Sequence, residues 1–106
     1  MVTTIVTEPE ISIYRALSKI DVVFEFKSSI MGEAVFDFYV PEYGIAISVI
    51  NSYSGNKAQD ALQQIGMESQ YGIKLIYITE EMALRNASFY TKEALAGRDH
   101  SDYGVW

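Results

Sequence analysis

Hydrophobic positions near the start of the chain recur at the spacing of a helix. Ile13, Leu17 and Ile20 are three and four residues apart, which places them on one face of a helix. Thr7 precedes this segment and can cap it, because its hydroxyl can accept a hydrogen bond from a free backbone N–H. The pattern predicts a helix over residues 8–19.

The next segments change to the spacing of strands. Residues 22–27 are rich in β-branched and aromatic side chains, which indicates a strand. Residues 33–40 alternate strictly, so Phe38 falls on one face and Asp37 on the other. Residues 45–50 are apolar nearly throughout, which is typical of a central strand covered on both faces. Turns are predicted between these strands, at 28–32 and 41–44.

The second half of the chain predicts a helix, a strand and a helical end. A polar loop at 51–56 leads into a helix over 57–71, which Gly72 stops. Ala58, Leu62 and Ile65 are expected to form its inner stripe, and Gln59, Gln63, Gln64 and Glu68 its outer face. The remaining predicted elements are a strand at 73–79, short helices at 80–86 and 91–96, and a polar tail at 97–106.

The order of these elements predicts an α/β fold with an αβββαβ core. Three strands between two helices, followed by a helix-linked fourth strand, favour a four-stranded mixed sheet flanked by helices. The length of 106 residues fits one domain, with no linker to divide it.

Composition limits the classes of partner and compartment. The net charge is −6 and the eight Lys and Arg are dispersed, which gives no support to strong nucleic-acid binding. The chain has no cysteine, which excludes disulfides and thiolate metal sites. No stretch is long enough for a membrane span and no signal peptide is evident, so we expect a cytoplasmic protein without a membrane partner.

Residues 37–50 resemble the hairpin of the PD-(D/E)XK nucleases. They are most similar to the small branch that looks like the very-short-patch mismatch repair endonucleases. Residues 72–78 are similar to the later strand of that branch. The resemblance covers roughly residues 8–82 and implies a restriction endonuclease-like core, with 83–106 as a C-terminal extension of one endonuclease-like domain. It also implies Mg²⁺-dependent hydrolysis of DNA phosphodiesters.

The resemblance also implies the site residues. The family carries an Asp on the first strand, then a Glu on the next, and a Lys or Asp two residues later. Asp37 matches the first position, whereas Ser48 and Ile50 replace the other two. A Mg²⁺ site would then need Asp37 with Glu10 or Glu8 from the first helix, helped by Ser48. If neither Glu8 nor Glu10 completes the site, no cofactor is expected.

Nucleic-acid contacts are implied for the loop after the third strand and for the helix that follows it. Lys57 is expected near the backbone of DNA, with Asn51 and Tyr53 in the loop. Each has an alternative. Lys57 and Asp60 fit a solvated i,i+3 ion pair, and the loop residues fit a simple turn.

Two functions of different class remain open. One is an endonuclease-like protein with weak or lost catalysis. The other is a non-catalytic binding or homo-oligomeric assembly module that uses the same fold. Aromatic residues in loops, helix ends and the tail favour an interaction surface, although scattered packing accounts for them equally well. These residues are Tyr53, Tyr71, Tyr90, Tyr103 and Trp106.

Overall fold

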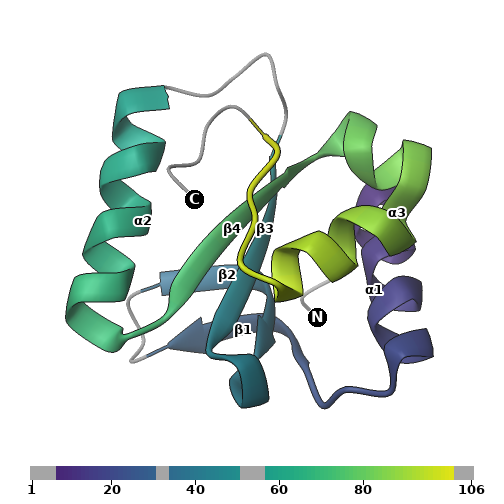
Figure 1. Ribbon diagram of the computed structural model, residues 1–106, viewed down its shortest axis with the longest axis horizontal. Coiled ribbons are helices and arrows are strands. Elements are labelled where there is room, and N and C mark those ends of the chain that lie inside the picture. Colours follow the sequence, from purple (N-terminus) through teal and green to yellow (C-terminus); the bar gives the residue numbers. More distant parts are fainter. Residues whose placement is uncertain (1–6, 31–33, 51–56, 102–106) are drawn as a thin grey trace, which may run out of the picture.

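A single mixed sheet forms the centre of the molecule. The computed structural model describes residues 7–30, 34–50 and 57–101. The strands follow the spatial order β1-β2-β3-β4, with antiparallel pairing up to β3 and parallel pairing between β3 and β4 (Figure 1). Their bounds are β1 Glu25–Ile30, β2 Ala34–Val40, β3 Ile45–Ile50 and β4 Lys74–Thr79. The predicted four-stranded mixed sheet is confirmed.

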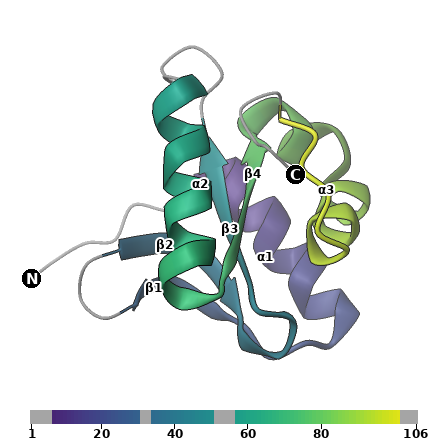
Figure 2. The ribbon, with the colours of Figure 1, turned by 60° about the vertical axis from the view of Figure 1, so that its left-hand side comes forward.

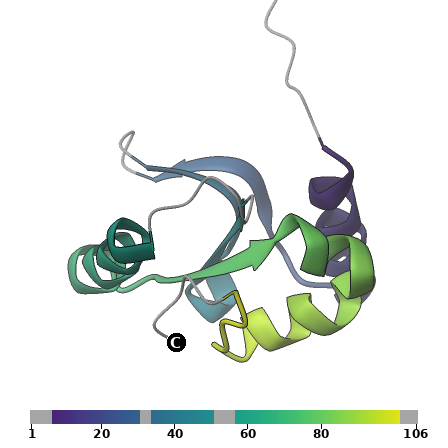
Figure 3. The ribbon, with the colours of Figure 1, turned by 90° about the horizontal axis from the view of Figure 1, so that it is seen from above.

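Helices cover both faces of this sheet. Helix α2 (Lys57–Tyr71) lies on one face, while α1 (Glu8–Ile20) and α3 (Glu80–Leu95) lie together on the other (Figures 2 and 3). The predicted α/β class, with a sheet flanked by helices, is therefore confirmed. Among the helices that the structure describes, none has the length and apolar character needed to span a membrane.

Helix α1 begins where the sequence predicts, because Thr7 caps it. The Thr7 hydroxyl accepts a hydrogen bond from the Glu10 N–H at 3.4 Å and donates one to Glu10 Oε1 at 3.0 Å. Thr7 is therefore the N-cap residue, and its hydroxyl also binds the side chain of Glu10. The helix ends at Asp21, whose φ of 65° is left-handed. It is one residue longer than predicted.

Two hydrophobic clusters lie on the two faces of β3 and β4. The larger cluster joins α1 and α3 to the sheet, and the smaller joins α2 to it. The larger contains Ile13, Leu17, Phe38, Val40, Ile45, Ile47, Ile76, Ile78, Ala83 and Ala94. The smaller contains Ala46, Met67, Ile73, Leu75 and Tyr77. Strand β3 is thus covered on both faces, as its apolar sequence predicts.

The predicted inner face of α2 is wrong. Leu62 and Ile65 are 69% and 47% exposed, whereas Gln64 is fully buried and Met67 nearly so. The cause is a hydrogen bond, since Gln64 Nε2 donates to the carbonyl of Leu75 on β4 at 2.8 Å. A buried carbonyl needs a donor, and Gln64 supplies one that an apolar side chain does not. The side chain of Ala58 lies outside the described residues.

The first strand lies three residues later than predicted. Pairing begins at Glu25 with Tyr39 and runs to Ile30 with Ala34, so the strand occupies part of the expected turn. Val23, inside the predicted strand, is 77% exposed. The hairpin partner decides these bounds, because β2 ends at Val40 and 3-10 helix η1 (Pro41–Tyr43) follows it. The turn predicted at 41–44 is confirmed.

The two short helices predicted near the C-terminus form α3, with an interruption. Asn86 has non-helical φ and ψ of −159° and 74°. Its side-chain oxygen accepts a hydrogen bond from the Phe89 N–H at 3.2 Å, so Asn86 caps the second half. The predicted end at residue 86 agrees with this interruption, but the helix resumes well before residue 91.

Candidate functional site

Strands β2 and β3 separate at Asp37. Their pairing runs from Val40 with Ile45 to Phe38 with Ile47, while β3 continues to Ile50 beside β4. Just past the last pair, Asp37 Oδ2 accepts a hydrogen bond from the Val49 N–H at 2.7 Å. The carboxylate therefore spans the two strands where their backbone ladder ends.

The backbone partner of this carboxylate lies between the two positions at which the sequence departs from the expected motif. Val49, its backbone partner, lies between Ser48 and Ile50. Because side chains alternate along a strand, Ser48 and Ile50 share the α2 face of β3 with Ala46. Asp37 shares that face of β2 with Tyr39, which packs against the smaller cluster. Asp37 and Ser48 thus lie on the same face of neighbouring strands of the predicted hairpin.

Tyr77 extends this row of polar side chains onto β4. It lies beside Ser48 in the parallel pairing and is 3% exposed. Its hydroxyl donates a hydrogen bond to Gln63 Oε1 of α2 at 3.1 Å. Sequence analysis missed Tyr77 and Gln63 because the register of a parallel pair is not readable from one sequence. The only available signal was a tyrosine within an otherwise aliphatic stretch.

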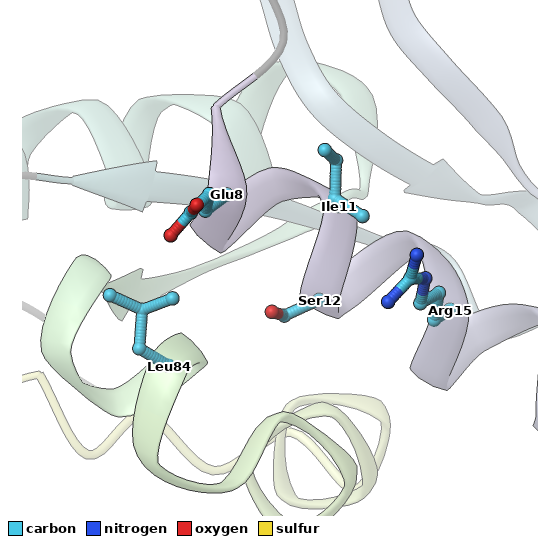
Figure 4. Close-up of a pocket in the computed structure, with 5 residues that line it drawn as sticks. All are labelled: Glu8, Ile11, Ser12, Arg15 and Leu84. Atoms are coloured by element: carbon cyan, nitrogen blue, oxygen red, sulfur yellow. The ribbon is translucent and has the colours of Figure 1, made fainter.

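The two glutamates of α1 face different surroundings. Glu10 is 6% exposed and lies on the same side of the helix as Ile13 and Leu17, which pack against the sheet. Glu8 is exposed and lines a surface pocket of about 290 Å³ between α1 and α3. Figure 4 shows Glu8 and Ser12 on the side of α1 that faces Leu84. Glu10 therefore lies on the sheet face that α1 and α3 cover, whereas strand alternation puts Asp37 on the α2 face with Tyr39, so the structure does not bring either glutamate beside Asp37.

The described residues do not form a Mg²⁺ site of the kind that the sequence resemblance predicts. Within 7–30, 34–50 and 57–101, no group of three or more His, Cys, Asp and Glu side chains could hold a metal ion. One oxygen of Asp37 is engaged by Val49, Ser48 is neutral and Ile50 has no donor. Mg²⁺ prefers carboxylate oxygens together with water. Where β2 and β3 separate, these residues therefore supply too few oxygen ligands for Mg²⁺.

The predicted nucleic-acid contacts are only partly placed. Lys57 is the first residue of α2, as expected, although its side chain is not described. Asn51 and Tyr53 lie outside the described residues. All three assignments stay predictions.

Several basic side chains are occupied within the chain. Arg85 pairs with Glu81, and Arg98 with Glu93. Hydrogen bonds from Arg98, and then from His100, lower the pKa of Glu93 from 4.5 to about 2. Because Arg85 and Arg98 are paired with glutamates, these two arginines are less available to bind phosphate groups than unpaired arginines would be.

Comparison with known proteins finds likeness in structure rather than in sequence. Neither protein-family models nor curated proteins match this chain. One solved structure is similar, the catalytic domain of the homing endonuclease I-Bth0305I, with a TM-score of 0.65 and 20% identity. The match covers 87% of this chain and 94% of that one. The chain therefore has a nuclease-like fold.

Proposed function

We propose that this chain is a PD-(D/E)XK endonuclease-like domain that interacts with nucleic acid and whose metal-dependent catalysis is weak or lost. In this proposal residues 1–106 form one domain, with 83–106 extending the core, in a cytoplasmic protein. The observation that carries the proposal is the position of Asp37. Its carboxylate contacts Val49 at the separation of β2 and β3, beside Ser48 and Ile50.

The nuclease-like fold supports this proposal independently of the site. The similar homing endonuclease domain matches nearly the full length of the chain, so the likeness extends beyond the hairpin. Mg²⁺ is the ion proposed for any residual cleavage, with Asp37 as its ligand in the hairpin and Ser48 on the neighbouring strand; Glu10, the other proposed ligand, lies on the opposite face of the sheet and would have to move to reach the ion. When bound, the ion would stabilise charge on the phosphate and acidify the attacking water.

A non-catalytic binding or assembly module is the second candidate. It is favoured by the short donor set around Asp37 and by the net charge of −6. Of the aromatic residues proposed for its surface, Tyr71 and Tyr90 pack against the two clusters. The others, Tyr53, Tyr103 and Trp106, lie outside the described residues.

A cleavage assay with two Asp37 variants tests the proposal. Wild type, D37A and D37N are incubated with supercoiled plasmid or single-stranded DNA and Mg²⁺ or Mn²⁺. We expect slow nicking by wild type, strongest with Mn²⁺, and none by either variant. D37N keeps an oxygen for the Val49 N–H but loses the charge, so it separates metal binding from folding.

The same variants distinguish the two candidates. DNA binding measured by fluorescence anisotropy at low salt, without nicking by wild type, would mean a nuclease-like domain that has lost catalysis, whereas the absence of both binding and nicking would support the non-catalytic assembly module. Equal nicking by all three proteins would show that Asp37 has no role in cleavage. E68A, which changes an exposed acid on α2, is the control for net charge.

A further inference from the structure

Strand β4 lies at the edge of the sheet, yet two of its outer backbone groups are hydrogen-bonded to side chains. The Leu75 carbonyl accepts from Gln64 Nε2 at 2.8 Å, and the Tyr77 N–H donates to Asp99 Oδ2 at 2.9 Å. Exposed edges of this kind are templates for pairing with another chain. Here two side chains take the place of a neighbouring strand.

Asp99 is held in this position by residues 97–101, which we call the C-terminal strap. Figure 1 shows the strap, in yellow, alongside β4. Ser101 donates from its backbone N–H to Asp99 Oδ1 at 2.8 Å and is 3% exposed. The fully buried Gln64 also donates to Asp99 Oδ2, at 2.9 Å. The polar tail predicted for this part of the chain therefore packs against the sheet.

The strap is also tied to α3. Arg98 Nε donates to Glu93 Oε1 at 3.0 Å, and His100 Nε2 lies 3.1 Å from the same oxygen. Successive strap side chains thus point alternately to α3 and to β4, as in an extended strand. Gly97, with a φ of 83°, turns the chain into this path. A Cβ there would lie 3.0 Å from Lys74 Nζ.

We propose that the edge of β4 is a self-association surface that Asp99 keeps closed, and that its occupant after loss of Asp99 is β4 of a second copy. Two identical edges in antiparallel orientation are self-complementary. Loss of Asp99 also removes one of the two acceptors that hold Gln64 Nε2 at this edge. Once Gln64 moves aside, the Leu75 carbonyl of each copy can accept from the Tyr77 N–H of the other. The strand sequence Lys-Leu-Ile-Tyr-Ile-Thr is rich in residues that favour such pairing and has no proline.

Hydrogen exchange at the Tyr77 amide, read together with solution mass, tests this proposal. In wild type we expect slow exchange that does not depend on protein concentration. In D99A at low concentration we expect exchange at least about tenfold faster, because a hydrogen bond to a charged group is lost. As concentration rises, the exchange should slow again while the mass measured by light scattering doubles.

Matched variants keep the test decisive. E68A makes the same change in net charge on exposed α2 and should behave as wild type. D99N keeps the side-chain volume and should show a smaller effect of the same kind. If D99A does not fold, D99N provides the readout, whereas S101A removes only a hydroxyl contact to the other oxygen of Asp99 and should exchange much as wild type does.

Three results would overturn the proposal. One is slow exchange of Tyr77 in dilute D99A, which would show that Asp99 does not protect the edge. Another is a D99A dimer in which Tyr77 stays unprotected, because the copies would then meet elsewhere. The last is protection of the Tyr77 amide in wild type only at high protein concentration, because Asp99 would then not keep the edge closed.

Discussion

At the scale of single residues, Asp37 has a structural role that needs no metal ion. Its hydrogen bond to Val49 joins two strands beyond the end of their backbone pairing. A hydrogen bond to a charged group contributes about 1.5–3 kcal/mol. Asp37 thus contributes to the fold whether or not it binds a metal ion, and its proposed metal-binding role is tested by restoring the neighbours that the resemblance predicts.

Restoring these neighbours gives the prediction at this scale. The double variant S48E/I50K places a second carboxylate and an ammonium group on the face of β3 that Asp37 approaches. We expect a gain of Mn²⁺ and Mg²⁺ binding in calorimetric titration, because two carboxylates on one face supply the hard oxygen ligands. D37N/S48E/I50K is the control and should bind at least about tenfold more weakly. A titration without heat in both would count against the assignment of these positions.

At the scale of elements, local signals predicted helix starts well and helix faces poorly. The start of α1 follows from Thr7 and Glu10, which are three residues apart and bind each other without help from the rest of the fold. The buried face of α2 depends on a distant carbonyl on β4, to which Gln64 donates. Hydrophobic periodicity does not contain that information, so the apolar Leu62 was wrongly placed inside.

The cap of α1 gives the prediction at this scale. T7A removes the hydroxyl that exchanges two hydrogen bonds with Glu10. We expect the free energy of unfolding, measured by urea denaturation, to fall by about 0.5–2 kcal/mol. S12A removes a hydroxyl from the interior of the same helix and should be neutral or slightly stabilising. Equal stability of the two variants would mean that the cap contributes little.

At the scale of the whole molecule, the candidate site depends on contacts that no local pattern encodes. The class, the strand order of the hairpin and the bounds of β3 and α2 were predicted, because each follows from periodicity and turn residues. The pairing of Ser48 with Tyr77 and the return of Asp99 to β4 were not, since both depend on how distant segments pack. The prediction of a polar tail at 97–106 was also incomplete, because His100 contacts Glu93, Phe89 and Tyr90 of α3.

The contact between the strap and α3 gives the prediction at this scale. Arg98 and His100 lower the pKa of Glu93 to about 2. A lowered carboxylate pKa stabilises the folded state above the ordinary value of 4.5, and this contribution is lost as the pH falls towards 2. We expect the Tyr77 amide to lose protection across that range in wild type, as measured by hydrogen exchange corrected for intrinsic rates.

The variant E93Q isolates this effect from the titration of other acids. It cannot ionise at that position, so the part of the change that belongs to Glu93 should be absent. Identical pH profiles for wild type and E93Q would mean that the ion pair does not hold the strap.

The bond between Asp37 and Val49 also bears on how such a site would decay over generations. Replacement of acidic or basic side chains at positions 48 and 50 removes activity but leaves both strands packed, so selection for a stable protein does not oppose it. Loss of the acid at 37 would in addition loosen the hairpin. A lineage that loses catalysis would therefore lose the ligands at positions 48 and 50 first. It would keep the acid at position 37 longest, because that acid also stabilises the hairpin.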